Sequence, residues 1–101
     1  MLSPSQKGAA IEYQAVAKFI EAGFQVFINA VPQGPADIVV WDLDTAYFID
    51  LKKINRYVRK DGSINYMAGE QKHDFIIYLG YCPHDGWIWL SEPPQALLNV
   101  F

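Results

Sequence analysis

Four charged residues interrupt apolar segments, and their types suit the hydrolysis of a phosphate ester. They are Glu12, Asp37, Asp50 and Lys52. Carboxylate oxygens such as those of Asp37 and Asp50 are hard ligands that suit Mg²⁺, which also takes phosphate oxygens and lowers the pKa of its bound water. A lysine beside them can orient or deprotonate that water, or stabilise the charge of the transition state. Together the four residues predict a metal-dependent site that cleaves phosphodiester bonds.

Two of these charges end a predicted strand. Because side chains alternate along a strand, positions 46, 48, 50 and 52 share one face, and that face changes from apolar to charged at Asp50 and Lys52. Asp37 opens the preceding strand after a loop rich in proline and glycine, and a hairpin would bring it near the level of Asp50. For Asp37 alone, a capping or turn role is the alternative.

Glu12 is unusual because of its place on a predicted helix. A helical wheel puts it within the apolar face that contains Ala15, Val16 and Phe19. A carboxylate facing the core needs a cation, hydrogen-bond donors or a proton. Glu12 can therefore hold a metal-bound water, a second metal or Lys52; a structural ion pair or a carboxyl that reaches the rim is the alternative.

The elements that must position these residues form one domain, residues 1–101. A helix capped by Ser3 or Ser5 is expected to run to about Ala22, with Gly23 as its stop. Strands are expected at 24–30, 36–42, 45–53, 74–81 and 86–91, a ribbon at 54–58 and 63–67, and a helical turn at 95–101. The expected fold class is α+β, a mixed sheet with the N-terminal helix packed on it.

Composition and charge limit the partners. A chain that is 51% hydrophobic and 15% aromatic is expected to form a packed core. The formal net charge of −3 gives no overall attraction to nucleic acid, yet five of the eight basic residues fall within nine positions. Such a basic strip can contact phosphates, and a solvated surface is the alternative.

Cysteine and hydropathy patterns indicate a cellular setting. Cys82 is the only cysteine, so no internal disulfide can form and a reducing cytoplasmic location is expected. Together with His73 and His84 it lacks the clustered spacing of zinc ligands. The N-terminus has no secretory signal and no apolar run approaches the roughly 18 residues of a membrane span, so no membrane partner is expected.

The order and spacing of the four charged residues resemble the core motif of the PD-(D/E)xK nuclease superfamily. That motif appears as Pro35-Ala36-Asp37, followed thirteen residues later by Asp50-Leu51-Lys52, with Ala36 as one departure. Gly8-x-x-x-Glu12 is similar to the N-terminal acidic motif of the family. Residues 7–92, especially 74–78 and 81–83, are similar to intron-type homing endonucleases, and Holliday-junction resolvases share the early motifs.

The resemblance implies a restriction-endonuclease-like core and a Mg²⁺-dependent DNA endonuclease, of homing type or acting on branched DNA, with Mn²⁺ as a substitute. It implies a metal site made by Asp37, Asp50 and the carbonyl of Leu51, with Glu12 nearby and Lys52 acting on the water. Candidates for DNA contact or support of the site are Lys53, Arg56, Arg59, Lys60, Gln71 and His73.

Two other functions stay open, and an oligomer is expected. A non-catalytic nuclease-fold module could bind nucleic acid or protein, but a degenerate site would be expected to lose one of the four charged residues. An interaction domain would use those residues as buried ion pairs, and tight divalent binding at Asp37 and Asp50 would argue against it. Because the chain is short and rich in aromatic residues, a homodimer or higher homo-oligomer is expected.

Overall fold

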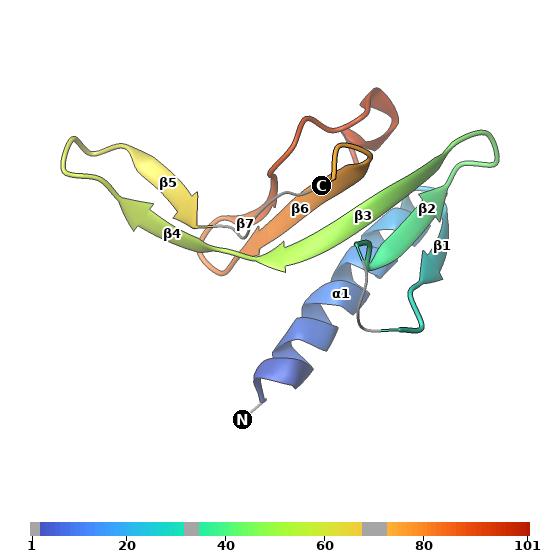
Figure 1. Ribbon diagram of the computed structural model, residues 1–101, viewed down its shortest axis with the longest axis horizontal. Helices are drawn as coiled ribbons and strands as arrows, with labels where there is room; N and C mark the ends of the chain where they lie inside the picture. Colours follow the sequence, from blue (N-terminus) through green and yellow to red (C-terminus); the bar gives the residue numbers. More distant parts are fainter. Residues whose placement is uncertain (1–2, 32–34, 68–72) are drawn as a thin grey trace.

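The fold is one long helix, a five-stranded mixed sheet and a separate two-stranded ribbon (Figure 1). The computed structural model describes residues 3–31, 35–67 and 73–101. The elements are α1 (Pro4–Glu21), β1 (Gln25–Ile28), β2 (Ile38–Trp41), β3 (Ala46–Lys53), β4 (Asn55–Val58), β5 (Ile64–Met67), β6 (Ile76–Cys82), β7 (Gly86–Trp89) and the 3-10 turn η1 (Gln95–Leu97).

The sheet has the order β1-β2-β3-β6-β7, and only β3 and β6 run parallel. A parallel pair needs a crossover connection, and the segment between these two strands contains the β4–β5 ribbon. The ribbon projects away from the sheet along the long direction of the molecule (Figure 1). The α+β fold class, with the N-terminal helix on a mixed sheet, is thus confirmed.

Local sequence signals set both ends of α1. The Ser3 hydroxyl accepts from the Gln6 amide at 3.2 Å, and the Gln6 side chain accepts from the Ser3 amide at 2.8 Å, which is a capping box. After the helix, Gly23 adopts φ of +98°, a conformation that favours glycine. No helix in the part of the chain that the structure describes is long and apolar enough to span a bilayer.

The core lies between α1 and one face of the sheet. Ala15, Val16 and Phe19 of α1 are buried there. They cluster with Ile38, Val40, Ile49, Leu79 and Leu97. The C-terminal Phe101 packs edge-on against Phe19, with ring centroids 5.2 Å apart. This packing fixes the helix against β2 and β3, the strands that carry the predicted site.

A glycine determines how β3 continues into the ribbon. Gly80 of β6 is the register partner of Lys52, and the buried Ile54 follows β3 directly. A Cβ at Gly80 would lie 2.8 Å from Ile54 Cδ1 and 3.2 Å from Leu90 Cδ1. The missing side chain therefore allows Ile54 to pack onto β6 and to hold the junction between the site and the ribbon.

Replacing Gly80 by alanine tests this packing. Gly80→Ala should lower the free energy of unfolding by about 1–3 kcal/mol, because the added methyl overpacks a filled site. Gly8→Ala is the control, since a Cβ at this helical glycine meets nothing within 4 Å. This substitution should raise the free energy of unfolding by about 0.5–1 kcal/mol. Urea denaturation measures both changes; equal stability of the Gly80 variant and the parent would contradict the packing argument.

Candidate active site

Asp37 lies at the entry to β2, where pairing with β3 is irregular. Ile38 is the register partner of Ile49, yet the Asp37 amide also donates to the Ile49 carbonyl at 2.9 Å. Two consecutive residues of one strand thus face a single residue of the other, as in a β-bulge. A bulge breaks the alternation of side chains along the strand and changes the direction of the Asp37 side chain. The sequence predicted that Asp37 lies near the level of Asp50 in the hairpin, but it did not predict this bulge.

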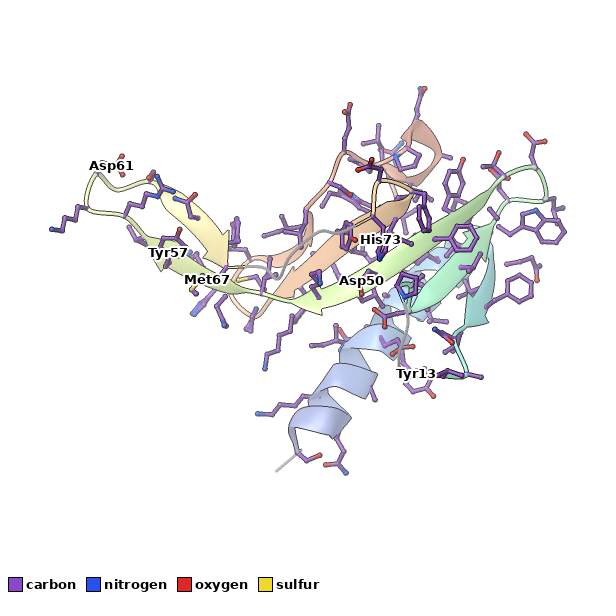
Figure 2. The ribbon with its side chains drawn as sticks, in the orientation of Figure 1. Tyr13, Asp50, Tyr57, Asp61, Met67 and His73 are labelled. Carbon is purple, nitrogen blue, oxygen red and sulfur yellow. The ribbon has the colours of Figure 1, made fainter. Side chains whose placement is uncertain are left out.

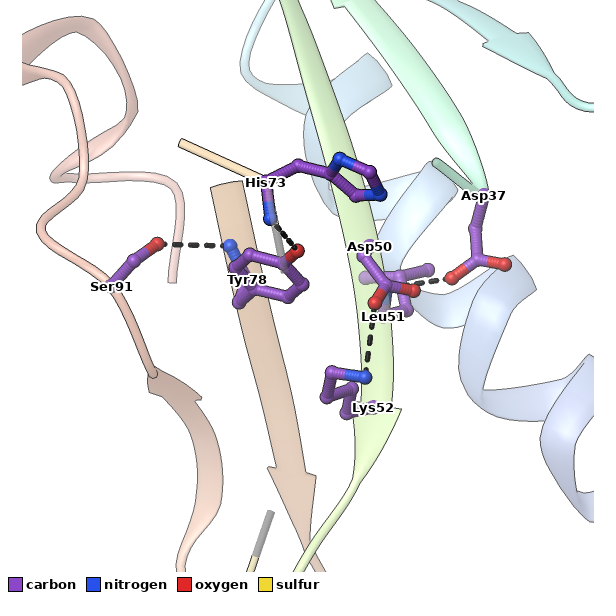
Figure 3. A network of polar contacts seen from close by, with 7 residues as sticks. All are labelled: Asp37, Asp50, Leu51, Lys52, His73, Tyr78 and Ser91. Atoms are coloured by element: carbon purple, nitrogen blue, oxygen red, sulfur yellow. Dashed lines mark hydrogen bonds and ion pairs between the residues drawn. The ribbon is translucent and has the colours of Figure 1, made fainter. Parts of the chain in front are cut away.

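The carboxylate of Asp37 faces both the backbone of β3 and a second carboxylate. Its Oδ2 accepts from the Leu51 amide at 2.7 Å (Figure 3). Burial raises the pKa of Asp37 to about 6, and a side-chain hydrogen bond to Asp50 and the negative charges of Asp50 and Glu12 add to this rise. The Leu51 amide opposes the rise in pKa without cancelling it. The site therefore contains carboxylates close enough to disfavour full ionisation.

Lys52 supplies the positive charge on the other side of Asp50. Its Nζ lies 3.1 Å from Asp50 Oδ2 and 5.5 Å from the ring centroid of Tyr78 (Figure 3). Tyr78 is the register partner of Asp50 on β6, and its hydroxyl accepts from the His73 amide at 3.1 Å. Asp50 and Lys52 thus share one face of β3, as alternation predicted, and the tyrosine is a neighbour that the sequence did not reveal.

Glu12 approaches the same place from α1. It is half-buried, as are Asp37, Asp50 and Lys52, so it lies at the border of the apolar face of the helix. A pocket of about 210 Å³ opens between the helix and the end of β3. Its lining residues are Gly8, Ile11, Glu12, Asp37, Leu51, Lys52 and Lys53. The helix glutamate, the bulge aspartate and the lysine therefore meet around one cavity.

The donor set fits a hard divalent cation that keeps much of its water. Within residues 3–31, 35–67 and 73–101, no three His, Cys, Asp or Glu side chains are grouped as a metal site would require. Mg²⁺ is commonly bound by only one or two carboxylates plus water and phosphate oxygens. Asp37 and Asp50 provide two carboxylates. The pKa of Asp37 is raised first by burial and then by its contacts with Asp50, and a bound cation would favour the ionised form against both effects.

The predicted DNA-contact residues lie in different settings. Lys53 is exposed at the rim of the pocket that it helps to line, and Arg59 and Lys60 are exposed in the turn between β4 and β5. Arg56 instead pairs with Asp85, with 3.5 Å between Nη1 and Oδ1. Gln71 lies outside the described residues. His73 is exposed, and its ring packs against Phe75 with 5.4 Å between centroids.

The raised pKa of Asp37 predicts a pH-dependent effect of Asp37→Asn on stability. The folded-state pKa exceeds the ordinary value of 3.8, so this carboxyl favours folding most below pH 3.8 and loses that contribution as pH rises through about 6. Relative to the parent, Asp37→Asn should gain stability over this window. The gain should be roughly 1–2 kcal/mol, because solvent around the half-exposed carboxyl reduces the effect of the full pKa shift.

Chemical denaturation between pH 4 and 7.5 measures the difference between the two proteins. The same substitution in an Asp50→Asn background is the control. Its gain should shrink there, because Asp50 supplies two of the causes that raise the pKa, and should not vanish, because burial remains. A difference that is flat across this pH range would contradict the coupling between the two carboxyls.

Comparison with known proteins gives one informative result. No protein-family model matches this sequence, and no curated protein matches it either. The fold is similar to the solved structure of a bacterial homing endonuclease, I-Ssp6803I, with a TM-score of 0.60. The match covers 96% of this chain and 86% of that chain at 15% sequence identity. At this identity the likeness concerns the fold alone: the chain has a nuclease-like α+β fold.

Proposed function

We propose that this protein is a metal-dependent endonuclease that hydrolyses phosphodiester bonds in DNA and is related to the PD-(D/E)xK enzymes. One observation carries the proposal: the carboxyls of Asp37 and Asp50 meet at the end of β3, with the Lys52 ammonium 3.1 Å from Asp50. The fold shared with a homing endonuclease supports it, because that protein is a nuclease on the same framework.

In this proposal the carboxylates hold Mg²⁺, or Mn²⁺ as a substitute. Asp37, Asp50 and the Leu51 carbonyl would be the ligands, and Glu12, which lines the same pocket as Asp37, would hold a water beside the cation or a second ion. Asp37 must lose its proton to act as a ligand, so activity is expected to fall below about pH 6. When bound, the cation supplies Lewis acidity and a water of lowered pKa.

Lys52 supplies the positive charge that the carboxylates cannot offer to a phosphate. Its ammonium is paired with Asp50 and borders the pocket, so a phosphate entering there meets a positive charge without a long movement of the side chain. The ammonium can stabilise the additional negative charge of the transition state or orient the attacking water, whereas only the neutral amine could accept a proton from that water. Glu12 and Asp50 position that water and the lysine respectively.

The substrate in this proposal is duplex or branched DNA. The net charge of −3 makes long-range attraction weak, so binding relies on the local cations from Lys53 to Lys60. Cutting both strands requires two active sites, so a homodimer or higher homo-oligomer belongs to the proposal. Exposed apolar side chains such as Phe27, Ile28 and Val31 provide surface for such an assembly.

A non-catalytic nuclease-fold module is the second candidate. The observation in its favour is that Glu12, Asp37 and Asp50 do not form a three-ligand group in the described part of the chain. Incubation with plasmid, branched and single-stranded DNA in Mg²⁺, Mn²⁺ or EDTA distinguishes the two candidates. The endonuclease proposal requires cleavage that depends on the metal, whereas the module would bind without cutting.

A comparison of the variants Lys52→Met and Lys53→Met tests the catalytic role of Lys52. Both substitutions keep most of the aliphatic stem and remove one charge, but only Lys52 pairs with Asp50. Lys52→Met should slow single-turnover cleavage by roughly 100-fold or more while leaving DNA affinity nearly intact. Lys53→Met should weaken binding slightly and leave the single-turnover rate unchanged at saturating enzyme. A normal single-turnover rate for Lys52→Met would remove the lysine from the mechanism.

A further inference from the structure

The β4–β5 ribbon has two faces with different chemistry. Opposite residues of an antiparallel pair share a face, and the register pairs Arg56 with Tyr66 and Tyr57 with Asn65. One face therefore carries Arg56, Val58, Ile64 and Tyr66. The other carries Asn55, Tyr57, Asn65 and Met67.

The first of these faces is anchored to the sheet. Asp85, in the turn between β6 and β7, accepts from the Tyr66 hydroxyl at 3.1 Å and pairs with Arg56 at 3.5 Å. The buried Cys82 brings its Sγ to 3.8 Å from the same carboxylate. This carboxylate thus orients the ribbon, so Arg56 and Tyr66 act as anchors at the base of their face. Nearer the tip of that face, Val58 and Ile64 are exposed.

The opposite face is turned outward and suits the recognition of base edges. Asn55, Tyr57 and Met67 are exposed and Asn65 is half-buried. Tyr57 and Met67 are labelled on the ribbon in Figure 2. Asparagine can pair in a bidentate manner with adenine, and the tyrosine hydroxyl can donate or accept a hydrogen bond. The major groove is wide enough to admit a two-stranded ribbon. We propose that the Asn55–Tyr57–Asn65 face enters the major groove and determines the sequence preference of the nuclease.

This inference rests on the proposed endonuclease function, and it also predicts where the recognised bases lie relative to the cleaved bond. Asn55 lies three residues after Lys52, and Tyr57 lies five residues after it. Along an extended chain their Cα atoms are therefore at most about 10 Å and 17 Å from the Cα of Lys52. At about 3.4 Å for each base pair, the bases that the ribbon reads lie within about five pairs of the cleaved bond. Arg59 and Lys60 at the tip reach the phosphates beyond that stretch.

A randomised cleavage library tests the proposal with the full chain. A plasmid library with random base pairs is cut in Mg²⁺, and the released ends are sequenced so that each base is placed relative to the cut. The parent protein should show a preference within about five pairs of the cut. Asn55→Ala and Asn65→Ala should each relax the preference at one position and slow cleavage of the preferred sequence by about 5- to 100-fold.

Matched variants separate recognition from other effects. Asn99→Ala, an exposed asparagine near the C-terminus, should leave the profile unchanged. Arg59→Ala should slow the cleavage of all sequences alike. Asn65→Asp exchanges a donor for an acceptor and should shift the preference toward cytosine, whose amino group donates; a misfolded ribbon cannot produce such a shift.

The possible results distinguish the two proposals. If the parent cuts DNA but Asn55→Ala and Asn65→Ala keep its profile and rate, the ribbon does not read sequence and only this inference fails. A parent profile that is flat within five pairs of the cut overturns it in the same way. If the parent cuts no DNA under any metal condition, the proposed function fails and the inference falls with it.

Discussion

The partial burial of two neighbouring carboxyls at the end of β3 is the constraint on which the site depends. Asp37 and Asp50 come from adjacent strands, and burial together with their proximity keeps the pKa of Asp37 near 6. Such an arrangement lowers stability at neutral pH unless a cation or a proton compensates. Lys52 compensates Asp50, and the Leu51 amide compensates Asp37 only in part. A divalent ion would compensate the remaining negative charge, and for this reason we propose metal chemistry here rather than a purely structural role.

The same strand connects this chemistry to the ribbon. β3 runs from the core through Asp50 and Lys52 to Ile54, which packs over Gly80, and then into β4. The Asp85 carboxylate fixes the far side of the junction through contacts with both strands of the ribbon. Because few flexible residues separate site and ribbon, the position of the ribbon on DNA would determine which phosphate reaches the pocket.

The sequence was sufficient to predict the order of the helix and strands. It was less sufficient to predict how these elements contact one another. Local patterns predicted α1 with a cap at Ser3 or Ser5, the β2–β3 hairpin and the shared face of Asp50 and Lys52. The structure selects Ser3 as the cap. The sequence did not predict the bulge at Asp37, which is defined by backbone hydrogen bonds to residues on two neighbouring segments, Asn29 and Ile49. The pairing of Arg56 with Asp85 joins residues 29 positions apart, and no local signal indicates it. The basic strip therefore looked uniform in sequence but is divided in the structure.

Calorimetric titration with Mn²⁺ tests the central claim, that the Asp37–Asp50 pair is a cation site. Titrations at pH 5.5 and 7.5, each in two buffers of different ionisation enthalpy, report affinity and the number of protons released. We expect tighter binding at pH 7.5, and release of most of one proton at pH 5.5 but almost none at pH 7.5, because Asp37 must ionise to bind. Asp37→Asn should abolish the proton release. Failure to bind Mn²⁺ at pH 7.5, or equal affinity without proton release at both pH values, would contradict the account.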